Sequence, residues 1–503
     1  MEILAFVLYF VIVLGIGCYF FISGRNKSGE KDYFLGGRQM GPWVTALSAQ
    51  ASDMSAWLLM GLPGSILAFG LGKAWIGIGL AIGTAANWIF VAKRLRRFSK
   101  AANDSITLPQ YLANRFVTGG KALQIISAVI FLVCFTVYVA SSFVAGTSVF
   151  TSVFPSLNSE TALIIFALII IAYTFLGGFK AVCWTDFFQG LLMLIALLAI
   201  PVVFAVTKSV DYSNLNTVYS YVDGNGSTVE CAFGTNLFGA GWQDIASGLA
   251  WGLGYFGMPH ILVRFMSIKK SSMVKKSATV AIIWVTIALA AAIVIAVIGR
   301  AYIGKELLDG VGNQKMVFIE LARKLFPGFI GGILLAAIIA ASMSTADSQL
   351  LVASSSFTSD MYKPLIRKNA TDKEVVWIGR ITVLAVAVVA YFIAKAKGSG
   401  AQAIMDMVEN AWGGFGASFG PVVLLSLFWK RMTYKGAVAG VVVGALTDIC
   451  WLIWLSGSTG VYELLPGFVA GLIACVVVTL IDKKPSSEVE ELFDTATNSA
   501  IDD

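Results

Sequence analysis

A single carboxylate, Asp53, lies inside the apolar stretch SAQASDMSAWLLMGLPG of residues 48–64. Four hydroxyl side chains around it recur at three- and four-residue spacing and would share one face of a helix: Thr45, Ser48, Ser52 and Ser55. Oxygen ligands of this kind suit a small, hard cation. The same pattern also fits a structural stripe of small residues, or an acid kept neutral, and the residues alone leave these alternatives open.

The helix that carries this stripe is interrupted by Gly61, Pro63 and Gly64. A second glycine- and proline-rich interruption, AWGLGYFGMPH, occupies residues 250–260. A helix broken inside a bilayer leaves backbone groups unpaired, which is tolerated where they line a cavity or contact a ligand. The paired breaks therefore favour a binding site, and two unrelated kinks are the alternative.

Another oxygen-rich run, AASMSTADSQLLVASSS, covers residues 340–356. Ser344 and Ser348 lie one turn apart, Thr345 is adjacent, and Asp347 adds a carboxylate with no nearby base in the sequence. Together with the run around Asp53, these groups predict a buried cation site.

The elements that must position these groups are membrane helices. Hydrophobic residues make up 57% of the 503 residues and charged residues 13%, a composition typical of a polytopic membrane protein. We expect an all-α protein with about thirteen transmembrane helices in a single domain, residues 1–481. The expected spans are near 3–23, 43–69, 74–92, 122–152, 161–179, 187–207, 242–262, 278–303, 329–357, 375–394, 401–428, 436–455 and 461–481.

Lysine and arginine concentrate in the loops that lie inside if the N-terminus is outside, such as KRLRRFSK at 93–100. The positive-inside tendency therefore predicts an external N-terminus and a cytoplasmic C-terminus in the cell membrane. The acidic tail, residues 482–503, is expected to be cytoplasmic and disordered. The net charge of +7 indicates topology and contact with the lipid bilayer, with no nucleic-acid partner and no obligate protein partner.

Several classes of protein are disfavoured by what the sequence lacks. There is one histidine, with no paired metal-ligand spacing and no GxxxxGK[ST] loop, so neither a metalloenzyme nor an ATP-driven pump is indicated. We expect a protein that is not an enzyme and that draws its energy from an ion gradient.

Five separated blocks carry a family resemblance: SDMSAWLLMGLPG, LPQYLANRF at 108–116, GGFKAVCWTDFFQ at 177–189, WGLGYFGMPHILVRFM at 251–266 and MSTADSQLL at 343–351. Together they resemble the sodium/solute symporter family from about residue 31 to 480. The resemblance implies a LeuT-like fold with inverted five-helix repeats. It places a first helix at 3–23, repeat one at 43–207, repeat two at 242–428 and extra helices at 436–481.

The resemblance also implies site residues. A sodium site is implied from carbonyls of Ala51, Met54 and Ala341 and hydroxyls of Ser344 and Thr345, with Asp53 in support. The substrate side resembles the proline carriers of the family at Ser55, Gly61, Tyr138, Trp251, Tyr255 and Pro259. Aromatic faces of Trp251, Tyr138 and Tyr255 are expected to contact the substrate ring and ammonium group.

Asp347 stands where the best-known proline carriers are expected to have serine. Some relatives bind a further sodium near this position, so the candidates for a second ion site are Asp186, Asp347 and Ser348. The resemblance implies co-transport of sodium and L-proline by alternating access. A sodium symporter for another amino acid, sugar or vitamin is the nearest alternative, and a passive channel is the alternative from another class.

Overall fold

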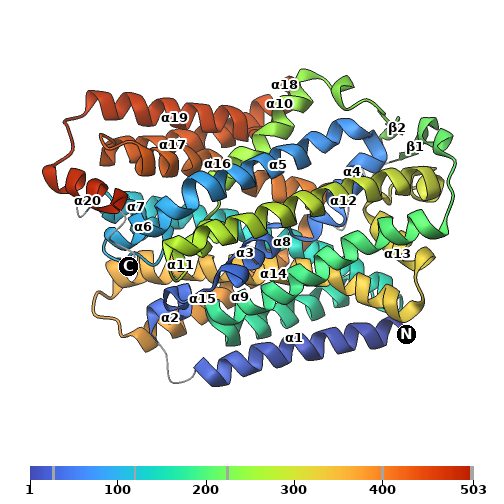
Figure 1. Ribbon diagram of the computed structural model, residues 1–503, viewed down its shortest axis with the longest axis horizontal. Coiled ribbons are helices and arrows are strands. Elements are labelled where there is room, and N and C mark those ends of the chain that lie inside the picture. The colour runs from blue at the N-terminus through green and yellow to red at the C-terminus, as the bar shows by residue number, and fades with distance from the viewer. Residues whose placement is uncertain (25–28, 118–119, 223–225, 398–400, 499–503) are drawn as a thin grey trace.

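The computed structural model describes residues 1–24, 29–117, 120–222, 226–397 and 401–498. Its long helices run roughly along the long axis of the molecule (Figure 1). The N-terminus and the hairpin β1–β2 lie at one end, and α2, α6, α7 and α20 lie at the other. Within the described residues, ten helices are long and apolar enough to cross a membrane.

The elements up to the central hairpin are α1 (Glu2–Gly24), α2 (Glu30–Leu35), α3 (Pro42–Asp53), α4 (Gly61–Phe69), α5 (Ala74–Ala86), α6 (Lys93–Ala101), α7 (Leu108–Asn114), α8 (Ala122–Val153), α9 (Ser159–Thr207), β1 (Tyr219–Val222) and β2 (Thr228–Cys231). After it come α10 (Trp242–Ala250), α11 (Pro259–Ser267), α12 (Val274–Leu308), α13 (Val317–Leu325), α14 (Gly328–Phe357), α15 (Asp372–Lys397), α16 (Ala401–Phe428), α17 (Tyr434–Cys450), α18 (Ser456–Thr459), α19 (Leu464–Ile481) and α20 (Ser487–Thr497). The two strands pair antiparallel, a small exception to the expected all-α fold.

Helix α14 lies at the centre of the bundle. Its segment from Leu334 to Ser356 is buried throughout, and it packs against α1, α3, α8 and α9. Alanine, serine and glycine dominate this segment, and such small side chains let neighbouring backbones approach closely. The oxygen-rich run of the sequence is therefore in the protein interior.

Two helices are broken, as the glycine and proline residues predict. Helix α3 ends at Asp53, a 3-10 turn follows at Ala56–Leu58, and α4 begins at Gly61. The sequence predicts the interruption at Gly61, Pro63 and Gly64, whereas α3 already ends at Asp53, with Met54 as its C-cap. Local hydrogen bonds explain the earlier end: the amide of Ser55 donates to the carbonyl of Asp53, and the hydroxyl of Ser55 accepts from the amide of Trp57.

The second break separates α10 from α11. A 3-10 helix at Trp251–Phe256 follows α10, and α11 begins with Pro259 at its first position. Proline suits that position because it lacks the amide hydrogen that would remain unpaired there.

Helix α9 differs from the prediction of two spans separated by a loop. The chain stays helical from Ser159 to Thr207 and is interrupted at Gly178, with φ 71° and ψ 175°. A side chain at this position would be strained, and a Cβ would lie 3.0 Å from Cδ2 of Tyr33. Asp186 therefore stands on a regular helix that packs against α3.

The tail is helical where disorder was expected. Helix α20 packs on α6, and its buried residues Val489, Phe493 and Ala496 share one face. Phe493 packs edge-on against Phe98 with the ring centroids 5.2 Å apart. These three residues are spaced four and then three positions apart, as on one face of a helix. Burial of this apolar face explains why the segment is helical despite its acidic composition. Residues 499–503 of the predicted tail lie outside the described residues.

Candidate functional site

The carbonyl end of α3 meets the middle of α14. The hydroxyl of Ser344 donates to the carbonyl of Ala51 at 2.8 Å and lies 3.2 Å from the carbonyl of Ala341. The last carbonyls of α3 have no following helical turn to accept from, so they are available to other donors or to a cation. The structure thus brings together three of the residues predicted for the sodium site.

Two further predicted residues border this contact. Met54 is the C-cap of α3, with non-helical φ and ψ, and is buried. Thr345 follows Ser344 on α14, and its buried hydroxyl has no hydrogen-bond partner within the described residues. An unpartnered buried oxygen of this kind can be completed by an ion, a ligand or an ordered water.

Asp53 ends α3 with a side chain only 5% exposed. Its Oδ2 accepts a 2.5 Å hydrogen bond from the hydroxyl of Tyr255. Tyr255 lies in the 3-10 helix of the other broken segment, and its carbonyl accepts from Nδ2 of Asn87 at 2.9 Å. A neutral hydroxyl, rather than a charged partner, therefore joins the acid of the first break to the second break.

The aromatic residues of the second break form a stack. Trp251 packs face to face on Trp57 at 5.7 Å, on Trp412 at 6.1 Å and on Tyr462 at 5.3 Å between ring centroids. Nε1 of Trp412 donates to the carbonyl of Trp251 at 2.9 Å. The sequence predicts free faces on Trp251 for a substrate, whereas here its neighbours are other aromatic rings.

The remaining predicted substrate residues lie around this stack. Ser55 is the N-cap of the 3-10 turn that contains Trp57. A Cβ at Gly61 would lie 2.8 Å from Cδ1 of Trp57. Tyr138 on α8 is buried, and its ring lies edge-on to His260, 6.4 Å away, one residue beyond Pro259. All six predicted substrate residues therefore border the two breaks.

Sequence reasoning missed Trp57 as a site residue. Its Nε1 is buried without a partner among the described residues. The signal was present, since Trp57 lies inside the interrupted WLLMGLPG run, but nothing in the sequence shows that its ring meets Trp251.

A second buried cluster surrounds Arg264 of α11. Its guanidinium donates to Oδ2 of Asp186 at 2.9 Å, to the hydroxyls of Ser48 and Ser348, and to the carbonyl of His260. Arg264 and Asp186 are 1% and 0% exposed. The sequence shows no base near Asp347 along the chain, but the structure brings Arg264 of α11 into this acidic region from just beyond the second break.

The candidates for a second ion site are thus placed together, with an arginine among them. Asp186 and Ser348 both contact the guanidinium of Arg264. Asp347 receives a 3.3 Å hydrogen bond from Ser348 on Oδ1, while its buried Oδ2 has no partner within the described part of the chain.

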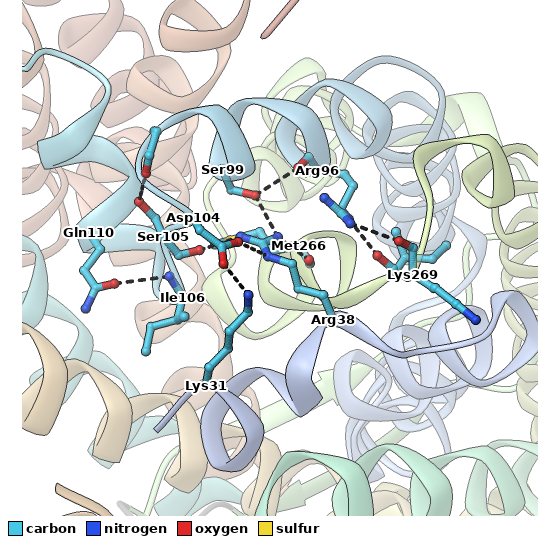
Figure 2. A network of polar contacts seen from close by, with 12 residues as sticks. Lys31, Arg38, Arg96, Ser99, Asp104, Ser105, Ile106, Gln110, Met266 and Lys269 are labelled. Atoms are coloured by element: carbon cyan, nitrogen blue, oxygen red, sulfur yellow. Dashed lines mark hydrogen bonds and ion pairs between the residues drawn. The ribbon is translucent and has the colours of Figure 1, made fainter. Parts of the chain in front are cut away.

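A polar network of different character lies at the end of the molecule that carries α2 and α6 (Figure 2). The guanidinium of Arg38, 5% exposed, donates to Asp104, to the hydroxyl of Ser99 and to the carbonyls of Ser105 and Met266. Lys31 also pairs with Asp104. Partial burial opposes ionisation of Asp104, but the hydrogen bond from Lys31 and the charge of Arg38 outweigh it and hold the pKa of Asp104 below its usual value.

Comparison with known proteins identifies relatives of the whole chain. A profile of the sodium:solute symporter family matches residues 33–444. The sodium/proline symporter of Haemophilus influenzae is 45% identical, over 98% of this chain and 97% of that protein. The high-affinity proline transporter PutP of Bacillus subtilis is 44% identical, over 94% of this chain and 97% of that protein.

Solved structures agree on the fold. A Na+-coupled sialic acid symporter in a substrate-bound, outward-open state matches with a TM-score of 0.71 at 18% identity, covering 96% of this chain and 98% of that one. Mhp1, a nucleobase-cation-symport-1 family transporter in a closed conformation, matches with a TM-score of 0.53 at 15% identity, covering 92% and 98%.

Proposed function

The chain belongs to the sodium:solute symporter family, and from that premise we propose how its residues couple the two movements of a sodium/proline symporter. The protein is a secondary active transporter that couples inward movement of sodium to uptake of L-proline, and its family is one of transporters rather than enzymes. The observation that carries the coupling proposal is the meeting of the two broken helices through the Tyr255–Asp53 hydrogen bond, next to the Ser344–Ala51 contact.

For sodium we propose five oxygen ligands: the carbonyls of Ala51, Met54 and Ala341 and the hydroxyls of Ser344 and Thr345. The 2.8 Å approach of Ser344 to the carbonyl of Ala51 and the orphaned hydroxyl of Thr345 support this set. The ion would take the place of the Ser344 hydrogen bond and tie α3 to α14. Asp53 supports the ion by its negative charge, at the end of α3.

For proline we propose a pocket between the breaks, bordered by Ser55, Gly61, Tyr138, Trp251, Tyr255 and Pro259. The backbone amides at the start of α4 and α11 offer positive helix ends to a carboxylate. An aromatic ring supplies an apolar face and attracts an ammonium group. Because Trp251 now stacks on Trp57 and Tyr462, substrate entry would require these rings to separate.

Coupling follows from the shared hydrogen bond. Sodium at the end of α3 fixes Asp53, Asp53 fixes Tyr255, and Tyr255 orders the second break where proline binds. One charge moving through 100 mV releases about 2.3 kcal/mol, and about 1.4 kcal/mol is a tenfold concentration ratio. A single sodium therefore sustains roughly fifty-fold accumulation of a neutral zwitterion.

A second ion near Asp186, Asp347 and Ser348 would have to share this site with the guanidinium of Arg264. We propose that this guanidinium serves as the fixed cation for Asp186, and that any further ion is held by Asp347, whose Oδ2 has no partner among the described residues.

We propose thirteen membrane crossings. Ten of them are the helices of sufficient length. The other three are the broken helix α3–α4, the first part of α9 and the broken helix α10–α11. The N-terminus is then outside, and the C-terminal helix α20 is in the cytoplasm beside the basic helix α6. Residues 43–207 and 242–428 form two inverted repeats that rock against each other in the cytoplasmic membrane.

Uptake by purified protein in lipid vesicles tests this function. Proline should accumulate above equilibrium when only an inward sodium gradient is imposed, and unlabelled proline should compete better than other amino acids, sugars or vitamins. Proline that only equilibrates across the membrane, without accumulation, would indicate a channel. Stronger competition by another solute would identify that solute, and not proline, as the substrate. Uptake that follows a pH gradient and ignores sodium would contradict sodium coupling.

A further inference from the structure

Two buried acids lie away from the sodium site, near the connection of α17 to α19 at the top of Figure 1. Asp448 of α17 is 3% exposed and Glu463, just before α19, is 2% exposed. Oδ1 of Asp448 and Oε1 of Glu463 are buried, and neither has a hydrogen-bond partner among the described residues. In the part of the chain that the structure describes, neither carboxyl group forms an ion pair with lysine or arginine.

The side chains of both acids lie beside Gly413 of α16. A Cβ added to Gly413 would lie 2.8 Å from Oδ1 of Asp448 and 3.4 Å from Cγ of Glu463. The absence of a side chain at Gly413 is what allows both acids to occupy this space. The two acids, one on α17 and one just before α19, therefore lie beside the same residue of α16.

The surrounding charge is also negative. Asp406 and Glu409 of α16 act electrostatically on this region, and the base that acts on Glu409 is Lys73. Lys73 itself pairs with Asp244 at 2.9 Å. From α8 the facing titratable group is Cys134, whose sulfur lies 2.9 Å from a Cβ built on Gly414.

Two ionised carboxylates cannot share a buried space without a cation. A metal ion needs several oxygen ligands at close range, whereas within the described residues the site has two unpartnered carboxyl oxygens. A proton on either carboxyl group removes its charge and so the repulsion between the two acids. The chemistry of the two acids therefore favours the binding of one proton.

The pair is connected to the substrate pocket by its chain neighbour. Tyr462 stacks on Trp251 at 5.3 Å, and its hydroxyl donates to the carbonyl of Glu409 at 2.8 Å. Its amide donates to the hydroxyl of Ser247 on α10, at 3.0 Å. Displacement of Glu463 would therefore move a ring that rests on the second helix break.

We propose that Asp448 and Glu463 form a proton-binding site that holds one proton between the two acids, and that its occupancy sets the packing of Tyr462 on Trp251 and so the affinity for substrate. The proton is carried by one of the two carboxyl groups when bound and leaves to water when both ionise, after which repulsion separates the side chains. The second part of the proposal rests on the proposed function, whereas the proton site does not.

Infrared spectroscopy of the purified full-length protein tests the proton site without any transport. The band of protonated carboxyl groups in the wild type should lose intensity in Asp448→Asn/Glu463→Gln, which keeps the side-chain shapes. The matched control is Asp406→Asn, an exposed acid of the same region, which should keep the band. An unchanged band in the double variant would overturn the proposal.

Equilibrium binding of proline at fixed sodium, measured from acid to alkaline pH, tests the connection to the pocket. The wild-type affinity should increase by at least severalfold as the pair loses its proton, because movement of Tyr462 favours the separation from Trp251 that substrate entry requires. The double variant should give a flat profile. A double variant with the wild-type pH profile would overturn the connection. A changed sodium affinity with an unchanged infrared band would show sodium as the occupant and contradict the proton assignment, and wild-type protein that binds no proline would refute the proposed function instead.

Discussion

The central site and the network at the α2–α6 end use polar groups in opposite ways. In the network at the α2–α6 end, the guanidinium of Arg38 donates to four acceptors, and Asp104 accepts from two cations. At the centre, Thr345, Trp57 and Asp347 each keep a buried polar atom without a partner among the described residues. A satisfied network holds elements in place, whereas an unsatisfied one is completed by what binds.

Arg264 tests the boundary between these two regions, because it lies at the centre but is fully engaged like Arg38. Arg264→Met should lower the free energy of unfolding by about 3–5 kcal/mol, because it leaves the carboxylate of Asp186 buried without its cation. Denaturant unfolding in detergent measures this change. Arg264→Met/Asp186→Leu should recover most of it, and a double variant as unstable as the single one would contradict the pairing.

Ser344→Ala should weaken the apparent sodium affinity by roughly ten- to a hundredfold, because a hydrogen-bonding group to a charged partner contributes about 1.5–3 kcal/mol. Sodium-dependent uptake at saturating proline measures it. The matched control is Ser342→Ala on the same helix, whose hydroxyl donates to its own helix at Ile338. Equal effects of both variants would mean that the contact with Ala51 has no special role.

Trp251→Phe should weaken proline affinity about two- to tenfold, because an aromatic pair contributes about 0.5–1.5 kcal/mol beyond its buried area. The sodium affinity should change less, since the proposed ion ligands lie at the end of α3 and on α14. Competition binding measures both. Trp454→Phe, at a 70% exposed position, is the control, and an equal loss in the control would contradict a pocket at Trp251.

Asp104→Asn should have the smallest effect of these variants: a small loss of stability to unfolding, with the sodium affinity unchanged. The pKa of Asp104 is lowered in the folded protein, so its contribution to stability is present above the unfolded pKa of about 3.9 and is lost as pH falls through the folded value. The melting temperature of the wild type should exceed that of the variant at neutral pH, and this difference should shrink in acid. A difference that grows in acid would contradict a lowered pKa of Asp104 in the folded protein.

The sequence predicts the helix breaks and most of the residues around them. Gly61, Pro63 and Pro259 mark local backbone requirements, which a local pattern can show. Arg264 was missed because its partners Asp186 and Ser348 are 78 and 84 positions away. Such contacts depend on how helices pack, and neither spacing nor composition reports that.

Other differences have local causes. The break falls at Met54 because the hydrogen bonds of Ser55 end the helix before the glycines do. The tail is helical because Phe493 packs against Phe98 of α6, a helix far away in the sequence. The stack of Trp251 on Tyr462 joins residues 211 positions apart, and no pattern in either segment indicates it.

Sodium-driven accumulation by Asp53→Asn/Thr345→Ala is the most direct test of the central claim that ligands from the broken α3 and from α14 bind the driving ion. In lipid vesicles with an imposed inward sodium gradient, the double variant should lose accumulation and its dependence on external sodium, while a folded protein is still recovered. Accumulation with wild-type dependence on sodium would contradict the account.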